Sequence, residues 1–138
     1  MILSGFTFKD GFLLAVKGRE YDIHNDYDWV ECSFDSNEAC AKIILKRSSG
    51  EWTNKSLPAS FELLFCGVTR FISKEGDPEL ASDSHTAAFV GFLFSENVEC
   101  MDGYLDDQTE DDQDFIVCME DHSAFKIQAN EVILSEGA

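Results

Sequence analysis

Carboxylate side chains are the residues of this chain best able to do chemistry, and many of them gather in one segment. Residues 99–114 carry eight acids and no base: Glu99, Asp102, Asp106, Asp107, Glu110, Asp111, Asp112 and Asp114. Like charges this close repel one another over a screening length of about 8 Å at physiological salt. Solvent, bound cations or a basic partner must offset this repulsion, so the segment is a solvated loop, a cation site or a docking surface.

A second acidic group surrounds a histidine. Asp22, His24, Asp26 and Asp28 alternate along the chain, so in an extended strand their side chains would share one face. A histidine between carboxylates can act as a general base held in one tautomer. No Gly-x-Ser-x-Gly, His-Glu-x-x-His or phosphate-binding motif accompanies it. The sequence therefore assigns no catalytic residue, and an enzyme with a site around His24 is the third of three functional hypotheses.

The net charge of −17 is unevenly distributed. Residues 1–69 contain 10 acids and 7 bases, a net charge of −3, whereas residues 70–138 contain 17 acids and 3 bases, a net charge of −14. Such a surface repels nucleic acid and anionic lipid and attracts basic proteins or cations. The charge argues against binding to a phosphate backbone and favours a basic protein partner.

The five cysteines do not form a recognisable motif. Their number is odd, and no two are spaced as Cys-x-x-Cys, which argues against a zinc site or a thioredoxin-like motif. In a reducing cytosol they are expected to be small buried hydrophobic residues. Cys40 and Cys100, which have polar neighbours, are the alternative candidates for a reactive thiol.

Alternation of apolar and polar residues predicts half-buried strands with one wet face. The side chains expected to face the core are Val30, Cys32, Phe34, Phe61, Leu63, Phe65, Phe125, Ile127 and Ala129. Those expected on the wet face of the same strands include Glu31, Ser33, Asp35, Lys126 and Gln128. Uninterrupted apolar runs predict further strands that are central or covered on both faces, at residues 12–16, 42–45, 87–94 and 115–119.

Short turn signals separate these strands. Lys9-Asp10-Gly11 is expected to close a hairpin, and Asp77-Pro78-Glu79 begins one or two helical turns at most. Short connections require antiparallel neighbours. The sequence therefore predicts one all-β, mainly antiparallel domain over residues 1–138, a two-sheet sandwich or partly closed barrel of about nine or ten strands. Residues 102–114 are expected to form a mobile acidic loop.

No segment of the sequence has the length or composition of a membrane anchor. The longest apolar run, residues 87–94, is far shorter than the roughly 20 residues needed to cross a bilayer. The first six residues lack the basic and apolar regions of a signal peptide. We therefore expect a cytoplasmic protein without membrane insertion.

The leading hypothesis is a non-enzymatic binding module that recognises a basic protein. The residues expected to make this contact are Asp102, Tyr104, Asp106, Asp107, Glu110, Asp111, Asp112 and Asp114. Asp22, Asp26 and Asp28 could extend the surface, with aromatic anchors from Tyr21, Tyr27 and Trp29, although these rings could equally fill the core. A small, acidic, β-rich protein without catalytic motifs resembles, in kind, immunity proteins that neutralise basic toxins.

The second hypothesis is a calcium-binding β-sandwich. Two acidic loops at one end of a sandwich resemble the calcium site of membrane-docking C2 domains, and calcium prefers six to eight oxygen ligands. The resemblance implies that acids of both loops converge on the metal, the candidates being Asp22, Asp26, Asp28, Asp106 and Asp107. Calcium is thus the one cofactor considered. Homodimerisation through an uncovered edge strand near Trp52 also stays open.

Overall fold

The chain folds almost entirely into β-strands, as the alternation of its residues predicts. The computed structural model describes residues 1–94 and 103–137. Twelve strands lie in these residues: β1 (Ile2–Ser4), β2 (Phe6–Lys9), β3 (Leu13–Val16), β4 (Arg19–Asp22), β5 (Tyr27–Asp35), β6 (Cys40–Arg47), β7 (Ser60–Cys66), β8 (Arg70–Lys74), β9 (Ala87–Leu93), β10 (Asp114–Met119), β11 (Ala124–Gln128) and β12 (Glu131–Gly137). The all-β prediction is confirmed, although the expected nine or ten strands were too few.

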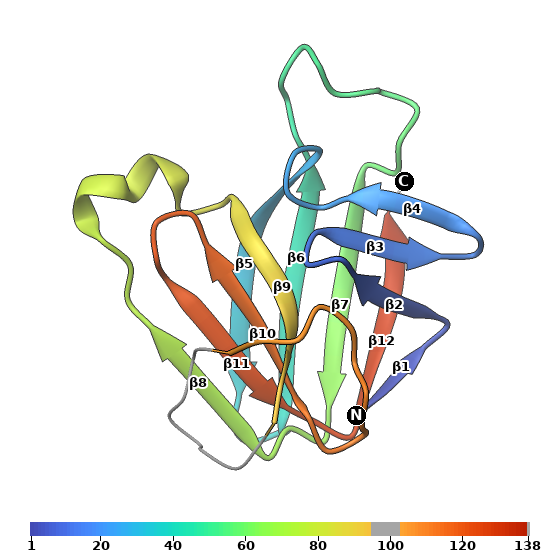
Figure 1. Cartoon of the computed structure of the whole chain (residues 1–138), viewed down its shortest axis with the longest axis vertical. Helices are drawn as coiled ribbons and strands as arrows, with labels where there is room; N and C mark the ends of the chain where they lie inside the picture. The colour runs from blue at the N-terminus through green and yellow to red at the C-terminus, as the bar shows by residue number, and fades with distance from the viewer. Residues whose placement is uncertain (95–102, 138) are drawn as a thin grey trace.

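The strands form three sheets. The five-stranded sheet has the order β1-β12-β7-β6-β5, the four-stranded sheet β8-β11-β10-β9 and the three-stranded sheet β2-β3-β4. Every pair is antiparallel except β1 and β12, which run parallel. Figure 1 shows the four-stranded and three-stranded sheets beside one another in front of the five-stranded sheet. The result is a sandwich in which the two smaller sheets together cover one face of the larger sheet.

Phe115 on β10 lies where the three sheets meet. Its ring centroid is 5.4 Å from that of Phe8 in the three-stranded sheet and 5.2 Å from that of Phe65 in the five-stranded sheet. Phe92, on the neighbouring strand β9, completes the cluster at 6.2 Å. All four rings are buried, so the core is continuous across both interfaces between the sheets.

The local turn predictions agree with the structure. β2 and β3 form the expected hairpin, with Lys9 opposite Leu13. A 3₁₀ helix, η1 (Pro78–Asp83), follows Asp77, whose carboxylate accepts a hydrogen bond of 3.0 Å from the Glu79 N–H. It is the only helical element in residues 1–94 and 103–137, and none of the described residues forms a helix with the length and hydrophobicity that a membrane span requires.

Two side chains of β5 that were expected in the core are exposed: Val30, and also Phe34, which lies opposite the buried Ala41 and stacks on Phe71 but is 42% exposed. Val30 was expected to face the core, but the register between β5 and β6 shifts at this residue, and its side chain is 39% exposed. The shift accompanies a contact with the segment before β9, in which the Trp29 N–H donates to the His85 carbonyl at 2.8 Å. An extra residue in one strand shifts the alternation, so that the side chain at this position points to the opposite face of the sheet. Cys32 lies opposite the buried Ile43 and keeps its inward direction.

The prediction for Lys126 is also wrong: it was expected on the wet face of its strand, but it is not solvated. It faces away from the sandwich core, as the alternation of β11 predicts, yet its side chain is fully buried. Its ammonium group lies 3.5 Å from the carboxylate of Asp114, which Arg70 also contacts at 2.6 Å. The Asp114 side chain is itself fully buried. This ion cluster joins β8, β10 and β11 on the outer face of the four-stranded sheet.

Replacing Asp114 by Asn removes the charge that both basic groups share while keeping the shape of the side chain. Breaking a buried ion pair leaves uncompensated charge, so the free energy of unfolding should fall by about 3 kcal/mol. The midpoint of urea unfolding measures this loss. Asp107→Asn, at an exposed position of the same acidic segment, is the matched control and should leave the midpoint nearly unchanged. Equal midpoints for the two variants would contradict a stabilising role for the cluster.

Candidate functional acidic surface

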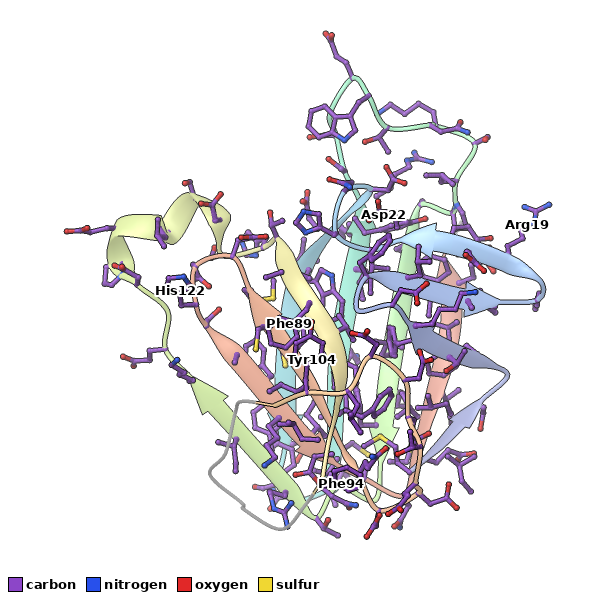
Figure 2. All side chains as sticks on the ribbon, in the orientation of Figure 1. Arg19, Asp22, Phe89, Phe94, Tyr104 and His122 are labelled. Atoms are coloured by element: carbon purple, nitrogen blue, oxygen red, sulfur yellow. The ribbon has the colours of Figure 1, made fainter. Side chains whose placement is uncertain are left out.

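The described part of the acidic segment packs against the edge strand β9. The Leu105 N–H donates to the Phe92 carbonyl at 2.7 Å, and the Phe92 N–H donates to the Leu105 carbonyl at 2.8 Å. One residue earlier, the ring of Tyr104 stacks on Phe89 with centroids 3.9 Å apart and an interplanar angle of 12° (Figure 2). The start of the segment is thereby attached to the sheet through its backbone and through an aromatic side chain.

Gly91 permits this close approach. A Cβ atom on Gly91 would lie 2.3 Å from the Leu105 carbonyl oxygen and 2.9 Å from the Tyr104 ring. Neither distance is compatible with a side chain, since carbon and oxygen atoms make contact at well over 3 Å. The glycine in the middle of an apolar strand is therefore explained by the backbone that crosses over it.

The end of the segment is held by a buried amide. The Gln113 side chain is fully buried, and its carbonyl oxygen accepts hydrogen bonds from the Thr109 N–H at 2.8 Å and the Glu110 N–H at 3.2 Å. Its NH₂ group donates to the Thr109 hydroxyl at 2.9 Å. Two backbone amides and a hydroxyl of the loop thus share one buried partner, which fixes the turn that precedes β10.

The N-terminus supplies a further set of contacts. The Gln108 amide donates to the Met1 carbonyl at 2.8 Å, and the Met1 amino group donates to the Asp111 carbonyl. These bonds use the backbone and the amides of the loop and leave its carboxylates uninvolved. These contacts attach the loop to the N-terminus through its backbone and a side-chain amide.

Most of the predicted contact residues are displayed on the outside. Tyr104 is 38% exposed, and the exposed acids are Asp106, Asp107, Glu110, Asp111 and Asp112. Within residues 1–94 and 103–137, no basic side chain forms an ion pair with Asp106, Asp107, Glu110 or Asp111. Asp114 departs from the prediction because it is buried between Arg70 and Lys126, where a partner could not reach it. Asp102 lies outside the described residues.

Asp10 joins this group from the other end of the chain. The hairpin turn between β2 and β3 lies against the loop, so that a Cβ atom on Gly11 would be 3.2 Å from an Asp106 carboxylate oxygen. Asp10 is exposed in the same turn. The sequence predicted this turn as a hairpin and gave no sign of its neighbour. In the structure, a hydrogen bond of 2.8 Å from the Val90 N–H to the Gly11 carbonyl joins the turn to β9.

We define the acidic surface by its seven exposed side chains: Asp10, Tyr104, Asp106, Asp107, Glu110, Asp111 and Asp112. Lys9 is the basic residue beside it, and its ammonium group is already paired with Glu20. The hydrogen bond and charge of Glu20 raise the pKa of Lys9, with smaller contributions from Asp10 and Asp107. Lys9 therefore forms its ion pair with Glu20 and also interacts with Asp10 and Asp107 of the surface.

The first acidic group does not extend this surface. The segment turns instead of extending: the Asp22 carboxylate accepts hydrogen bonds from the His24 N–H at 3.0 Å and the Asn25 N–H at 2.9 Å. Partial burial, together with the charge of Asp22, raises the pKa of Asp26. Figure 2 shows Asp22 well separated from Tyr104, at the end of β4. In the described residues, no three His, Cys, Asp or Glu side chains are grouped closely enough to hold a metal ion.

The aromatic residues around that group fill the core. Tyr21, Tyr27 and Trp29 are all buried, and Tyr21 and Tyr27 both pack against Phe61. The Tyr27 hydroxyl donates to the Pro58 carbonyl at 2.8 Å, and the Trp29 indole donates to the Ile23 carbonyl at 3.1 Å. Of the four aromatic residues considered as anchors, Tyr104 alone belongs to the acidic surface.

The His24 ring contacts two other segments of the fold. Its Nδ1 atom is hydrogen-bonded to the Ala87 carbonyl, and the same atom lies 3.8 Å from the Glu120 carboxylate. These contacts connect the turn after β4 to the start of β9 and to the β10–β11 connection. Donation from Nδ1 to a carbonyl fixes the tautomer of a neutral imidazole. The hydrogen bond therefore orients the ring toward a backbone group.

Comparison with known proteins returned no match: no family model, curated protein or solved structure resembles the chain closely enough to assign it. The class of the protein is therefore the one that its own fold defines, an all-β sandwich. Its function has to be argued from the acidic surface and the loop that carries it.

Replacing Gly91 by Ala tests whether β9 fixes the loop. The added methyl group collides with the Leu105 carbonyl, so the loop must separate from the strand, and overpacking of this kind costs about 1–3 kcal/mol. We expect a lower unfolding midpoint together with changed NMR shifts for Tyr104 and Leu105. Wild-type shifts for both residues in a folded Gly91→Ala protein would contradict the described contact.

Proposed function

We propose that this protein is a non-enzymatic binding module that recognises a basic protein through its acidic surface. One observation carries the proposal: exposed carboxylates without basic partners in the described structure are displayed on a loop that backbone and amide contacts hold in place. These contacts give the exposed acids a defined arrangement that a partner can recognise. Four acids of the loop, Asp106, Asp107, Glu110 and Asp111, form the centre of the proposed contact.

The fixed loop supports the proposal energetically. Association costs less when the binding residues are already ordered, because fewer side chains and backbone angles lose freedom. A concentrated negative potential also accelerates the encounter with a positive partner, with the larger effect on the association rate. Tyr104 adds apolar contact area beside the charges, and tyrosine is enriched among residues that dominate binding energy.

The charge also limits the class of partner. A nucleic acid, an anionic membrane or a second copy of this chain at −17 would be repelled by the surface. A basic protein is the macromolecule that the charge favours. We further propose that the protein binds this partner in the cytoplasm. No contact among the described residues favours calcium binding or catalysis over this function.

Neutralising the centre of the surface tests the proposal. A loop variant carries Asp106→Asn, Asp107→Asn, Glu110→Gln and Asp111→Asn. A control variant carries the same change in net charge at exposed acids elsewhere, namely Glu51→Gln, Glu75→Gln, Glu79→Gln and Asp83→Asn. Each protein is immobilised and exposed to a lysate of the source organism, and the retained proteins are identified by mass spectrometry.

We expect a basic protein to be retained by the wild type and by the control variant, and lost by the loop variant. With that protein purified, the association rate should fall at least about tenfold in the loop variant, and its salt dependence should weaken. A partner that associates with the loop variant and the wild type at the same rate would contradict the proposal.

A further inference from the structure

Two of the cysteines lie directly opposite each other on neighbouring strands. Cys40 at the start of β6 pairs with Cys66 at the end of β7, although 25 residues separate them in the sequence. Both are partly exposed on the outer face of the five-stranded sheet, since their neighbours Ala41 and Phe65 point into the core.

The register places the two thiols at a position favourable for a bond. The Arg47 N–H donates to the Ala59 carbonyl, and these two residues continue the β6–β7 register as a hydrogen-bonded pair. Hydrogen-bonded and non-hydrogen-bonded pairs alternate along antiparallel strands. Counting back from Arg47, Cys40 and Cys66 form a non-hydrogen-bonded pair. Such pairs have Cα atoms about 4.5 Å apart, within the roughly 4.4–6.8 Å that a disulfide spans.

Cys40 is the more accessible of the pair for a reagent. It lines a cavity of about 340 Å³ together with Asp35, Glu38, Lys42 and three other residues. Its thiol lies 3.4 Å from the Glu38 carbonyl. Cys66 does not line this cavity; partial burial and the neighbouring Cys40 and Glu131 raise the pKa of its thiol. Cys40 is therefore positioned to react first, and Cys66 to react second.

We propose that Cys40 and Cys66 form a redox-active cross-strand dithiol that reduces small-molecule disulfides and closes to an intramolecular disulfide. The Cys40 thiolate attacks one sulfur of the small disulfide, forming a mixed disulfide and releasing one thiol. The Cys66 sulfur, on losing its proton, then attacks Cys40, which releases the second thiol. Both cysteines are oxidised, the small disulfide is reduced to two thiols, and the two protein protons end on the released thiols.

The surroundings indicate which small disulfide reacts best. Asp35 and Glu38 line the cavity beside Cys40, and Glu131 lies opposite Cys66 on β12. Lys42 is the single base among the cavity residues. A net negative site concentrates cationic reagents. Cystamine, a disulfide with two ammonium groups, is therefore the probe of choice.

Treatment of the wild-type protein with cystamine, followed by non-reducing peptide mapping, tests the proposal. We expect a protein lighter by two hydrogens in which the peptides of Cys40 and Cys66 are joined. Cys32→Ala is the matched control, because burial raises the pKa of the Cys32 thiol to about 12 and its loss should leave the Cys40–Cys66 bond intact. Either a bond between other cysteines or a pair that stays reduced would overturn the proposal.

Cys66→Ser separates the two steps. This variant keeps the attacking thiol and lacks the second one, so it should accumulate one half-cystamine on Cys40. Cys40→Ser should acquire no such adduct on Cys66 under the same conditions. A wild-type protein that retains the adduct on Cys40 without closing the bond would overturn the proposed role of Cys66.

Discussion

The packing of Phe115 is the interaction on which the other parts of the structure depend. Its ring contacts one phenylalanine from each of the three sheets, Phe8, Phe65 and Phe92. Each such aromatic pair contributes about 0.5–1.5 kcal/mol beyond the burial of its area. The two smaller sheets cover the larger one side by side, and Phe115 contacts all three sheets at their junction.

The two residues before Phe115 connect the core to the outer face of the four-stranded sheet and to the acidic loop. Asp114 faces the opposite side of β10 and binds Arg70 and Lys126, which orders the outer face of the four-stranded sheet. Gln113 then turns its buried amide to the loop and holds Thr109 and Glu110. Three consecutive residues therefore connect the core, the sheet and the loop.

The sequence was sufficient for the fold class because alternation is a local signal. Phe61, Leu63 and Phe65 face the core as their spacing predicts, and the β2–β3 turn and the Asp77 cap were readable from a few adjacent residues. Contacts between distant segments were not readable. Asp114 ends a run of acids and looks solvated until Arg70 and Lys126 are placed beside it, and Lys126 occupies a position that alternation alone assigns to water.

The same reason explains the outcome at the surface. The exposure of Tyr104 and of most acids of the loop was predictable from composition, because a dense run of like charges favours contact with solvent. Asp10 belongs to the acidic surface because Gly11 is hydrogen-bonded to β9. Cys40 lies opposite Cys66 because of the register between β6 and β7. Neither contact between distant segments can be predicted from adjacent residues. Val30 was misplaced because a single extra residue in β5 reverses the alternation.

The central claim is that the acidic surface exists in the free protein as a formed structure. Amide hydrogen exchange at Leu105 and Thr109 tests it most directly, since the first N–H is bound to Phe92 and the second to the buried Gln113. The account predicts that both amides exchange at least about a hundredfold more slowly than in an unstructured peptide, which corresponds to roughly 3 kcal/mol for local opening. Exchange at the rate of an unstructured peptide would contradict it, because the acids of the loop would then have no defined arrangement in the free protein.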